Sequence, residues 1–168
     1  MNRSEHEVCL LLGSNIQPEM NLSRAAALIR ERLKVLQVSS VWESRAVGFD
    51  GPDFLNAAML VSTPLSATAL KEQILLPLED QMGRVRCDEK NAPRQIDLDI
   101  ITFDGRPVDP DLWRYSYRAI PVAEILPGCL SNSGEELAQA AERLARAAAL
   151  RPRPDVSIRP IRKNGAAS

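Results

Sequence analysis

The chain has 168 residues, of which 45% are hydrophobic and 26% charged, and its 21 Lys and Arg nearly balance its 22 Asp and Glu. This composition is that of a globular protein, and the length favours one domain with a sizeable core over a disordered or fibrous chain. No apolar run approaches the roughly 20 residues that cross a bilayer, and residues 1–7 lack the apolar segment of a signal peptide. We therefore expect no membrane association and no export.

The cysteines and the single histidine exclude several kinds of site. Cys9, Cys87 and Cys129 are far apart and form no CxxC pair, so neither a disulfide framework nor a zinc site is indicated, and a cytoplasmic location is expected. His6 precedes the first apolar run, and we interpret it as solvated and without a role. Catalysis then depends on carboxylates, arginines, backbone groups or a metal ion.

Three strands and one helix are predicted in the first part of the chain. Apolar runs predict strands over residues 8–12, 35–47 and 54–61. Between the first two strands, apolar residues recur at helical spacing after Pro18 and form one helical face. The residues of this face are Leu22, Ala25, Ala26, Ile29 and Leu33.

The second part of the chain predicts two helices and one more strand. Ser66 can cap a helix whose apolar residues again have helical spacing, with a kink or break at Pro77. Strict alternation of apolar and polar residues predicts a strand over residues 95–103. Near the C-terminus, Ser133-Gly-Glu-Glu136 has the form of a capping box and predicts an Ala-rich helix to about residue 150.

The predicted order is β-α-β-β-α-β followed by one helix. It indicates an α+β, ferredoxin-like fold, in which an antiparallel sheet has helices on one face, plus an extra C-terminal helix. We predict a single domain over residues 1–150 and a basic, Pro-containing extension over residues 151–168, which holds five Lys and Arg against Asp155 alone. We interpret this part as a mobile extension rather than a nucleic-acid arm, with a short strand over residues 156–158 as the alternative.

Two aspartates stand out in the last predicted strand. Side chains alternate across a strand, so Asp97 and Asp99 share one face at a spacing of roughly 7 Å. Two carboxylates without histidine suit a hard cation, and Mg²⁺ is commonly held by one or two carboxylates together with phosphate oxygens. An amphipathic strand with a solvated outer face is the alternative interpretation.

The segment before this strand is basic. Arg84, Arg86, Lys90 and Arg94 lead into it, and cations beside a carboxylate-held Mg²⁺ are the arrangement expected for a polyphosphate. Taken singly, each arginine is more often a surface ion-pair partner. The chain contains neither a P-loop nor a Gly-x-Gly-x-x-Gly after a strand, so a nucleotide would be bound without a glycine-rich cradle.

Residues 90–101, Lys-Asn-Ala-Pro-Arg-Gln-Ile-Asp-Leu-Asp-Ile-Ile, resemble the signature of the 6-hydroxymethyl-7,8-dihydropterin pyrophosphokinase family. Further family landmarks appear in order, namely Gly13-Ser-Asn15, Pro52-Asp-Phe-Leu-Asn56, Leu78-Glu79, Gly83-Arg-Val-Arg86 and Pro121-Val-Ala-Glu-Ile125. The resemblance covers residues 8–150. It implies a ferredoxin-like α+β fold and a Mg²⁺-dependent kinase of folate biosynthesis, a transferase that moves pyrophosphate from ATP to the pterin hydroxymethyl group and releases AMP.

The same resemblance implies two Mg²⁺ ions, ATP as co-substrate and roles for particular residues. Asp97 and Asp99 would hold the metal ions, and they would act in catalysis together with Arg84 and Arg94, which stabilise the moving phosphates. The nucleotide-binding residues it implies are Arg84, Arg86, Arg94, Glu79 and Gln73. The pterin-binding residues it implies are Phe54 and Tyr117 by stacking, Asn56 through its amide, and the loop residues Ser44, Val47 and Gly48. The expected partners are these small molecules alone, with no nucleic acid and no membrane, and the expected assembly is a monomer.

Two alternative functions remain at this point. Family members commonly carry a Pro-His-containing segment after the catalytic strand, whereas residues 108–117 contain no histidine. A catalytically weak pterin- or nucleotide-binding paralogue, with a regulatory role or a different pterin, is therefore one alternative. An RNA-binding ferredoxin-like domain is disfavoured, because the chain is 4% aromatic and its body is acidic.

Overall fold

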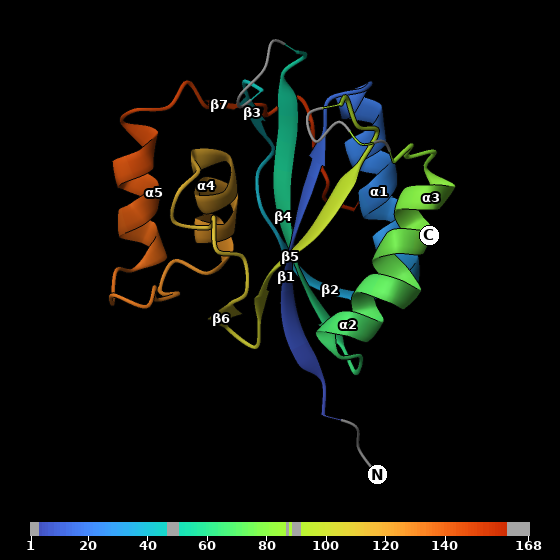
Figure 1. The fold of residues 1–168 in the computed structure, drawn as a ribbon, viewed down its shortest axis with the longest axis horizontal. Helices are drawn as coiled ribbons and strands as arrows, with labels where there is room; N and C mark the ends of the chain where they lie inside the picture. The colour runs from blue at the N-terminus through green and yellow to red at the C-terminus, as the bar shows by residue number, and fades with distance from the viewer. Residues whose placement is uncertain (1–3, 47–50, 87, 89–91, 161–168) are drawn as a thin grey trace, which may run out of the picture.

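The structure, a computed structural model, describes residues 4–46, 51–86, 88 and 92–160. Its described part contains a seven-stranded sheet with the order β6-β5-β1-β4-β3-β7, in which β2 also pairs with β4. The strands are β1 (His6–Ser14), β2 (Lys34–Val38), β3 (Trp42–Ser44), β4 (Phe54–Thr63), β5 (Asp97–Phe103), β6 (Arg106–Pro107) and β7 (Arg151–Pro152). Every pairing is antiparallel. The predicted α+β class with an antiparallel sheet is therefore confirmed (Figure 1).

Helices cover both faces of this sheet (Figure 1). One face carries α1 (Pro18–Arg32) and a helical segment made of α2 (Ala67–Leu70), the π-helical turn η1 (Lys71–Leu75) and α3 (Leu76–Gln81). The other face carries α4 (Ser116–Ile125) and α5 (Leu137–Ala145). The expectation of helices on one face of the sheet is met by α1 and by the helical segment from α2 to α3, which lie on the same face. The addition is larger than the one extra helix expected, because α4 and α5 together cover the second face.

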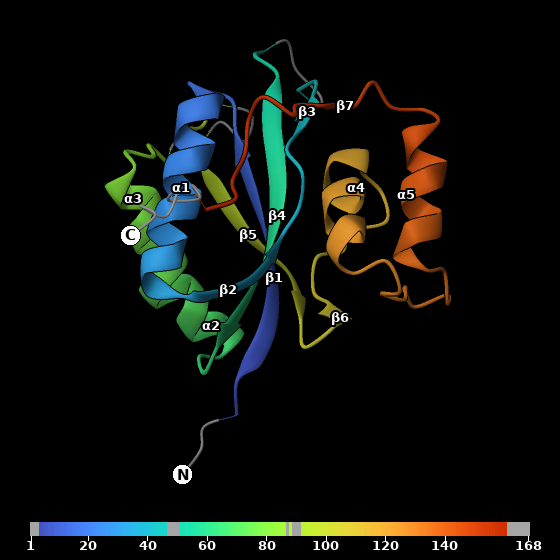
Figure 2. The same cartoon turned by 180° about the vertical axis from the view of Figure 1, so that it is seen from behind.

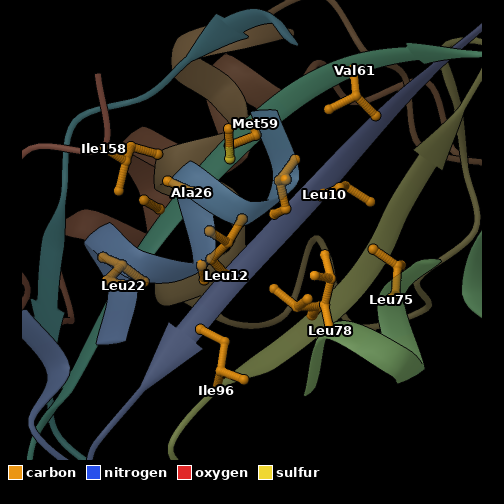
Figure 3. Close-up of a cluster of buried hydrophobic side chains, with 14 of the residues drawn as sticks. Leu10, Leu12, Leu22, Ala26, Met59, Val61, Leu75, Leu78, Ile96 and Ile158 are labelled. Atoms are coloured by element: carbon orange, nitrogen blue, oxygen red, sulfur yellow. The ribbon is translucent and has the colours of Figure 1, made fainter. Parts of the chain in front are cut away.

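The central strands are apolar on both sides because each side packs against helices. Leu10 and Leu12 of β1 contact α1 and α3 through the first core cluster, where Leu22, Met59 and Leu78 also lie (Figure 3). The intervening residues of β1 pack in a second cluster with α4 and α5. A strand buried on both faces loses apolar surface to each layer, which explains its continuous apolar sequence rather than an alternating one.

Two local predictions are confirmed, whereas the predicted C-terminal helix is wrong in both its cap and its end. Ser66 does cap α2, since its hydroxyl accepts a hydrogen bond from the Ala69 backbone N–H at 3.2 Å. The expected irregularity at Pro77 appears as the π-helical turn that precedes α3. The capping box at 133–136 does not form: α5 begins at Leu137, and its N-cap Glu136 makes no side-chain capping bond. The helix also ends at Ala145, short of the predicted residue 150.

The interpretation of the C-terminal part as a mobile extension is wrong for residues 151–160. Figure 2 shows this segment crossing from α5 on one face to α1 on the other. It pairs with β3 through β7, and the side chains of Val156 and Ile158 are buried in the first core cluster. The short strand considered over residues 156–158 is absent there, because those residues contribute side chains to the core without pairing to a strand.

The interpretation of His6 as solvated and without a role is also wrong, because its side chain makes two structural contacts. It begins β1, its Nδ1 lies 2.7 Å from an oxygen of Asp104, and its ring packs on Phe103 at 4.7 Å between centroids. These contacts join the start of β1 to the turn after β5, at the end of the sheet opposite Ser14.

Among the described residues, no helix is long and apolar enough to span a membrane.

Ile158→Ala is expected to destabilise the fold by about 2–5 kcal/mol, because a nearly fully buried isoleucine leaves a cavity when it is shortened. Urea unfolding followed by circular dichroism measures this change. Leu130→Ala is the control, since Leu130 is 54% exposed and its loss should change the free energy of unfolding by roughly 0.5 kcal/mol or less. Equal, small effects of both substitutions would contradict the packing of the C-terminal segment.

Candidate active site

The candidate site lies at the end of the sheet where β1 finishes and β4 and β5 begin. The strand registers place Gly13 opposite both Asn56 and Asp97. Residues that oppose one another across a sheet point to the same face, so Asp97 and Asn56 face the same side with only Gly13 between them. Neighbouring strands are about 4.8 Å apart, which sets the backbones of Asp97 and Asn56 about 10 Å apart. This face is the one that α4 covers.

Gly13 keeps the middle of this row open. A Cβ atom at Gly13 would lie 3.2 Å from Oδ1 of Asn56 and 4.0 Å from a ring carbon of Phe54. Asn56 is buried and its Nδ2 donates a hydrogen bond of 2.9 Å to the hydroxyl of Ser44, which is also buried. Phe54 is half-buried two residues before Asn56 on the same face. The arrangement offers a flat ligand an amide edge next to an aromatic ring.

Two arginines converge on the carboxylate of Asp97. Nη1 of Arg84 lies 3.0 Å from its Oδ1, and Nη1 of Arg94 donates to its Oδ2 at 2.8 Å. Arg84 also contacts the carboxylate of Glu79, which α3 holds in a buried position, and Arg86 lies 3.5 Å from the same carboxylate. Burying Glu79 against a guanidinium satisfies its charge and fixes the direction in which Arg84 points.

Arg94 is held by the backbone as well. Its N–H donates to Oδ1 of Asn15 at 2.6 Å, and the Asn15 N–H donates to the Arg94 carbonyl at 3.1 Å. Asn15 directly follows β1, so these bonds tie the loop before β5 to the end of the central strand. The backbone of Arg94 is therefore fixed, and its side chain extends from a defined position beside Asp97.

Asp99 has a different environment. Burial and the neighbouring charge of Asp97 raise its pKa to about 6, while Arg118 opposes this rise. Arg118 belongs to α4, and its Nη1 lies 3.6 Å from Asp99 and 2.8 Å from Asp109. Two carboxylates that repel each other at one strand end favour a cation beside them.

The donor set fits Mg²⁺ shared with a phosphate ligand. Among the residues that the structure describes, no three His, Cys, Asp or Glu side chains converge as a metal cage. Asp97 and Asp99 provide hard oxygen donors from one strand face, and Mg²⁺ usually takes one or two carboxylates and completes its shell with water and substrate phosphates. The site is thus suited to a metal ion that arrives with a polyphosphate.

Tyr117 lies in the first turn of α4, half-buried against the second core cluster. Its ring stacks on Tyr115 with centroids 5.5 Å apart, and the Arg118 guanidinium lies 5.4 Å from the Tyr117 ring centre. Tyr117 and Phe54 thus belong to elements that meet on the same face of the sheet. Among the described residues the two rings make no direct ring contact.

The structure brings most of the predicted site residues together. Arg84, Arg86, Arg94, Glu79 and Asp97 form one connected group, with Asp99 two residues along β5, while Ser44, Asn56 and Phe54 lie across the Gly13 gap. Gln73 is exposed on η1 and has no hydrogen bond or ion pair to any described site residue. Val47 and Gly48 lie outside the described residues.

Sequence reasoning missed four residues of the site. Gly13 and Asn15 were noticed only as landmarks, although a glycine and an amide directly after a buried strand were a signal for a close approach. Arg118 and Asp109 carried no signal, because α4 itself was not predicted.

Carboxylates and arginines gathered at one end of an antiparallel α+β sheet are the arrangement expected of an enzyme that handles phosphate groups of small molecules. Residues 9–127 match the model of the family described as 7,8-dihydro-6-hydroxymethylpterin-pyrophosphokinase (HPPK). The chain belongs to this family, and it is an HPPK-type diphosphokinase of folate biosynthesis that uses ATP.

Individual relatives agree with this assignment. The chain is 32% identical to a Synechocystis sp. protein named 2-amino-4-hydroxy-6-hydroxymethyldihydropteridine pyrophosphokinase, over 83% of this chain and 76% of that one. It is 42% identical to a Campylobacter jejuni protein of the same name, over 61% of this chain and 66% of that one. A solved Plasmodium falciparum HPPK-DHPS triple mutant shares the fold with a TM-score of 0.65 at 11% identity, over 84% of this chain and 44% of that chain. This chain thus spans less than half of that longer protein.

Proposed function

We propose that the row Asp97–Gly13–Asn56 is the reaction centre, with ATP bound over the carboxylate side and the pterin over the amide side. The hydroxymethyl oxygen of 6-hydroxymethyl-7,8-dihydropterin forms a bond to the β-phosphorus of ATP. The bond from that phosphorus to the α,β-bridging oxygen breaks, AMP leaves, and the hydroxyl proton passes to solvent. The observation that carries this proposal is the convergence of Arg84 and Arg94 on Asp97, one strand away from the gap at Gly13.

Asp97 and Asp99 are the proposed ligands of two Mg²⁺ ions, which supply charge neutralisation for the triphosphate. The raised pKa of Asp99 and its repulsion from Asp97 support this role, because both are relieved when a cation is present. With a cation held at Asp97, Arg84 and Arg94, which both contact this carboxylate, would be able to turn their guanidinium groups toward the phosphates. Such forks match phosphate geometry and stabilise the charge that develops during transfer.

The other three residues proposed to bind the nucleotide differ in the role that we assign to each and in the support for it. Arg86 is half-exposed beside Glu79 and contributes positive charge at the rim of the site. Glu79 is only 2% exposed and already contacts Arg84, so it acts by orienting that arginine. Gln73 has the weakest support, because none of its described contacts leads to the site.

For the pterin, Asn56 supplies a directional amide and Ser44 fixes its orientation. Phe54 offers one ring face, and Tyr117 of α4 is the proposed partner on the other side. Backbone groups of Val47 and Gly48 complete the proposed pterin contacts. Holding two substrates in line is worth several powers of ten in rate without any covalent intermediate.

We also propose a monomeric, cytoplasmic enzyme that binds neither nucleic acid nor membrane. The exposed large apolar side chains of the described part come from five different segments of the chain, and this spread supports the proposed monomer. They are Met20, Leu36, Val85, Val108 and Leu130. Cys9 and Cys129 are buried and unpaired, as is usual for thiols in a reducing compartment.

The direct test is release of AMP from ATP by the purified chain. AMP is expected only when Mg²⁺ and 6-hydroxymethyl-7,8-dihydropterin are both present, in a one-to-one ratio with the pterin pyrophosphate. Omitting the pterin or chelating the metal provides the controls. Pterin binding without AMP formation would overturn the proposed reaction and favour a catalytically weak paralogue or a different pterin.

A further inference from the structure

The C-terminal segment 151–158 lies beyond the family-matched residues 9–127, yet it is built into the molecule. Its first residues form β7, in which Arg151 opposes Glu43 of β3. The Arg153 N–H then donates to the Val41 carbonyl at 2.9 Å. Farther on, Ile158 is buried in the core, and its carbonyl accepts a hydrogen bond from Arg30 of α1. The segment is thus attached to the sheet and to a helix at once.

Its two arginines clamp one carboxylate. Nη2 of Arg151 lies 2.9 Å from Oε1 of Glu43, and Nη1 of Arg153 lies 2.9 Å from Oε2. Arg153 is itself oriented by Asp155 at 2.8 Å and Glu19 at 3.3 Å. Hydrogen bonds from Arg153 and Arg151 lower the pKa of Glu43, and those of Asp155 and Glu43 raise the pKa of Arg153. Each oxygen of Glu43 therefore has its own charged donor, a geometry that restricts the backbone as well as the side chain.

Glu43 is the neighbour of a proposed pterin residue. Ser44 follows it in β3 and points to the opposite face, where its hydroxyl accepts the hydrogen bond from Asn56. β3 is only three residues long, and without β7 it would be an unpaired edge of the sheet. A strand this short has few ladder bonds of its own, so a clamp on its outer side decides how firmly it is held.

The segment also forms part of a cavity beside Ser44. This cavity of about 300 Å³ is bounded by the end of β3, the residues before β4 and the link from α5 to β7. Ala149 comes from that link and Arg151 from β7 itself, and the remaining walls are Glu43, Ser44, Arg45 and Asp53. The C-terminal part of the chain therefore borders the proposed pterin end of the site at Ser44, whereas Asp97 lies on β5, which β1 and β4 separate from β3.

We propose that the C-terminal segment 151–158 positions the pterin subsite by clamping Glu43 between Arg151 and Arg153. Glu43 holds β3 in place, and β3 holds Ser44 against Asn56, so that the amide keeps its orientation toward the ligand. Arg151 and Arg153 are positioning residues and do not touch the substrate. The inference rests on the proposed function, because it requires that Asn56 contact the pterin.

The test is steady-state kinetics of an Arg151→Ala/Arg153→Ala variant with each substrate varied in turn. The KM for pterin is expected to rise about fivefold, the effect of losing about 1 kcal/mol of binding free energy. The KM for ATP and kcat should stay within about twofold of the parent values. Arg153→Lys with Arg151 intact should restore most of the pterin affinity, because it keeps one charge at Glu43. Arg143→Ala is the matched control, since Arg143 of α5 pairs with Glu135, which precedes that helix, and does not reach β3.

Two further variants separate the possible failures. Glu43→Gln removes the negative charge of the clamp and leaves both arginines and the buried Ile158 in place. It must therefore show the same selective rise in pterin KM, even if the double arginine variant unfolds at a lower temperature than the parent. Unchanged pterin KM in Glu43→Gln, or an equal rise in both KM values, would overturn the positioning role. If Asn56→Ala raises the pterin KM and Glu43→Gln does not, only the clamp is refuted. If Asn56→Ala has no effect, the proposed pterin site fails and the clamp inference fails with it.

Discussion

Asp97→Ala and Asp99→Ala are each expected to lower Mg²⁺-dependent turnover by roughly 10³-fold or more, because a metal ion supplies several kcal/mol of transition-state stabilisation. The fold should persist, since both side chains are partly exposed at the sheet end and neither belongs to a core cluster. AMP release at saturating ATP and pterin measures the loss, and thermal unfolding checks the fold.

Asp104→Asn is the matched control for these two substitutions. Asp104 directly follows β5 at the far end of the sheet, where it pairs with His6, and its φ of 51° is a value that asparagine tolerates. This variant should keep full turnover. Parental activity in Asp97→Ala or Asp99→Ala would refute the metal assignment, whereas loss in all three variants would point to a general effect of removing an acidic charge from β5 or the turn after it.

Arg94→Ala is expected to lower kcat by roughly 10³-fold, the lower range for a guanidinium that stabilises transferred phosphoryl charge. The KM for pterin should change less than about threefold, because Arg94 lies on the Asp97 side of the gap at Gly13. Arg94→Lys should recover only part of the rate, since an ammonium cannot make the two-pronged contact of a guanidinium.

Arg106→Ala provides the comparison for Arg94→Ala. Arg106 is an exposed arginine of β6 at the opposite end of β5, and its loss should leave kcat unchanged. An unchanged kcat in Arg94→Ala would remove Arg94 from the mechanism. Equal losses of kcat/KM for ATP and pterin with kcat preserved would instead assign Arg94 to binding.

The elements that could be predicted are those with a strong local pattern. Alternating residues predicted the strand that became β5, and the apolar spacing after Pro18 predicted α1, because each period is read within one element. The candidate residues of the basic loop and of β5 were also found from adjacent sequence, since the residues that lead into a strand lie near its first side chains. Ser44 and Asn56, twelve residues apart, were named through the family resemblance, and the antiparallel pairing of β3 with β4 brings them into hydrogen-bond contact.

The failures have a common physical cause. α4 contains Pro121 and only ten residues, so its local helix signal is weak, and it is stabilised by packing on the sheet. The C-terminal segment resembles a linker in composition, but Val156 and Ile158 are buried in the core cluster that α1 shares with the sheet, which no local pattern reveals. Residues 133–136 have the residue types of a capping box, yet the Glu135 N–H donates its hydrogen bond to the hydroxyl of Ser131 rather than to that of Ser133.

The sequence alone determined the chemistry that this protein can perform: two aspartates on one strand face, arginines before them and no histidine near the site. Those are properties of residue type and short-range spacing. Tertiary structure decided which groups cooperate, because Arg118 reaches Asp99, Glu79 orients Arg84, and Glu43 is clamped from the C-terminal segment only after distant parts of the chain have packed together. Such partners are chosen by strand register and burial, which are long-range quantities that a local pattern does not contain.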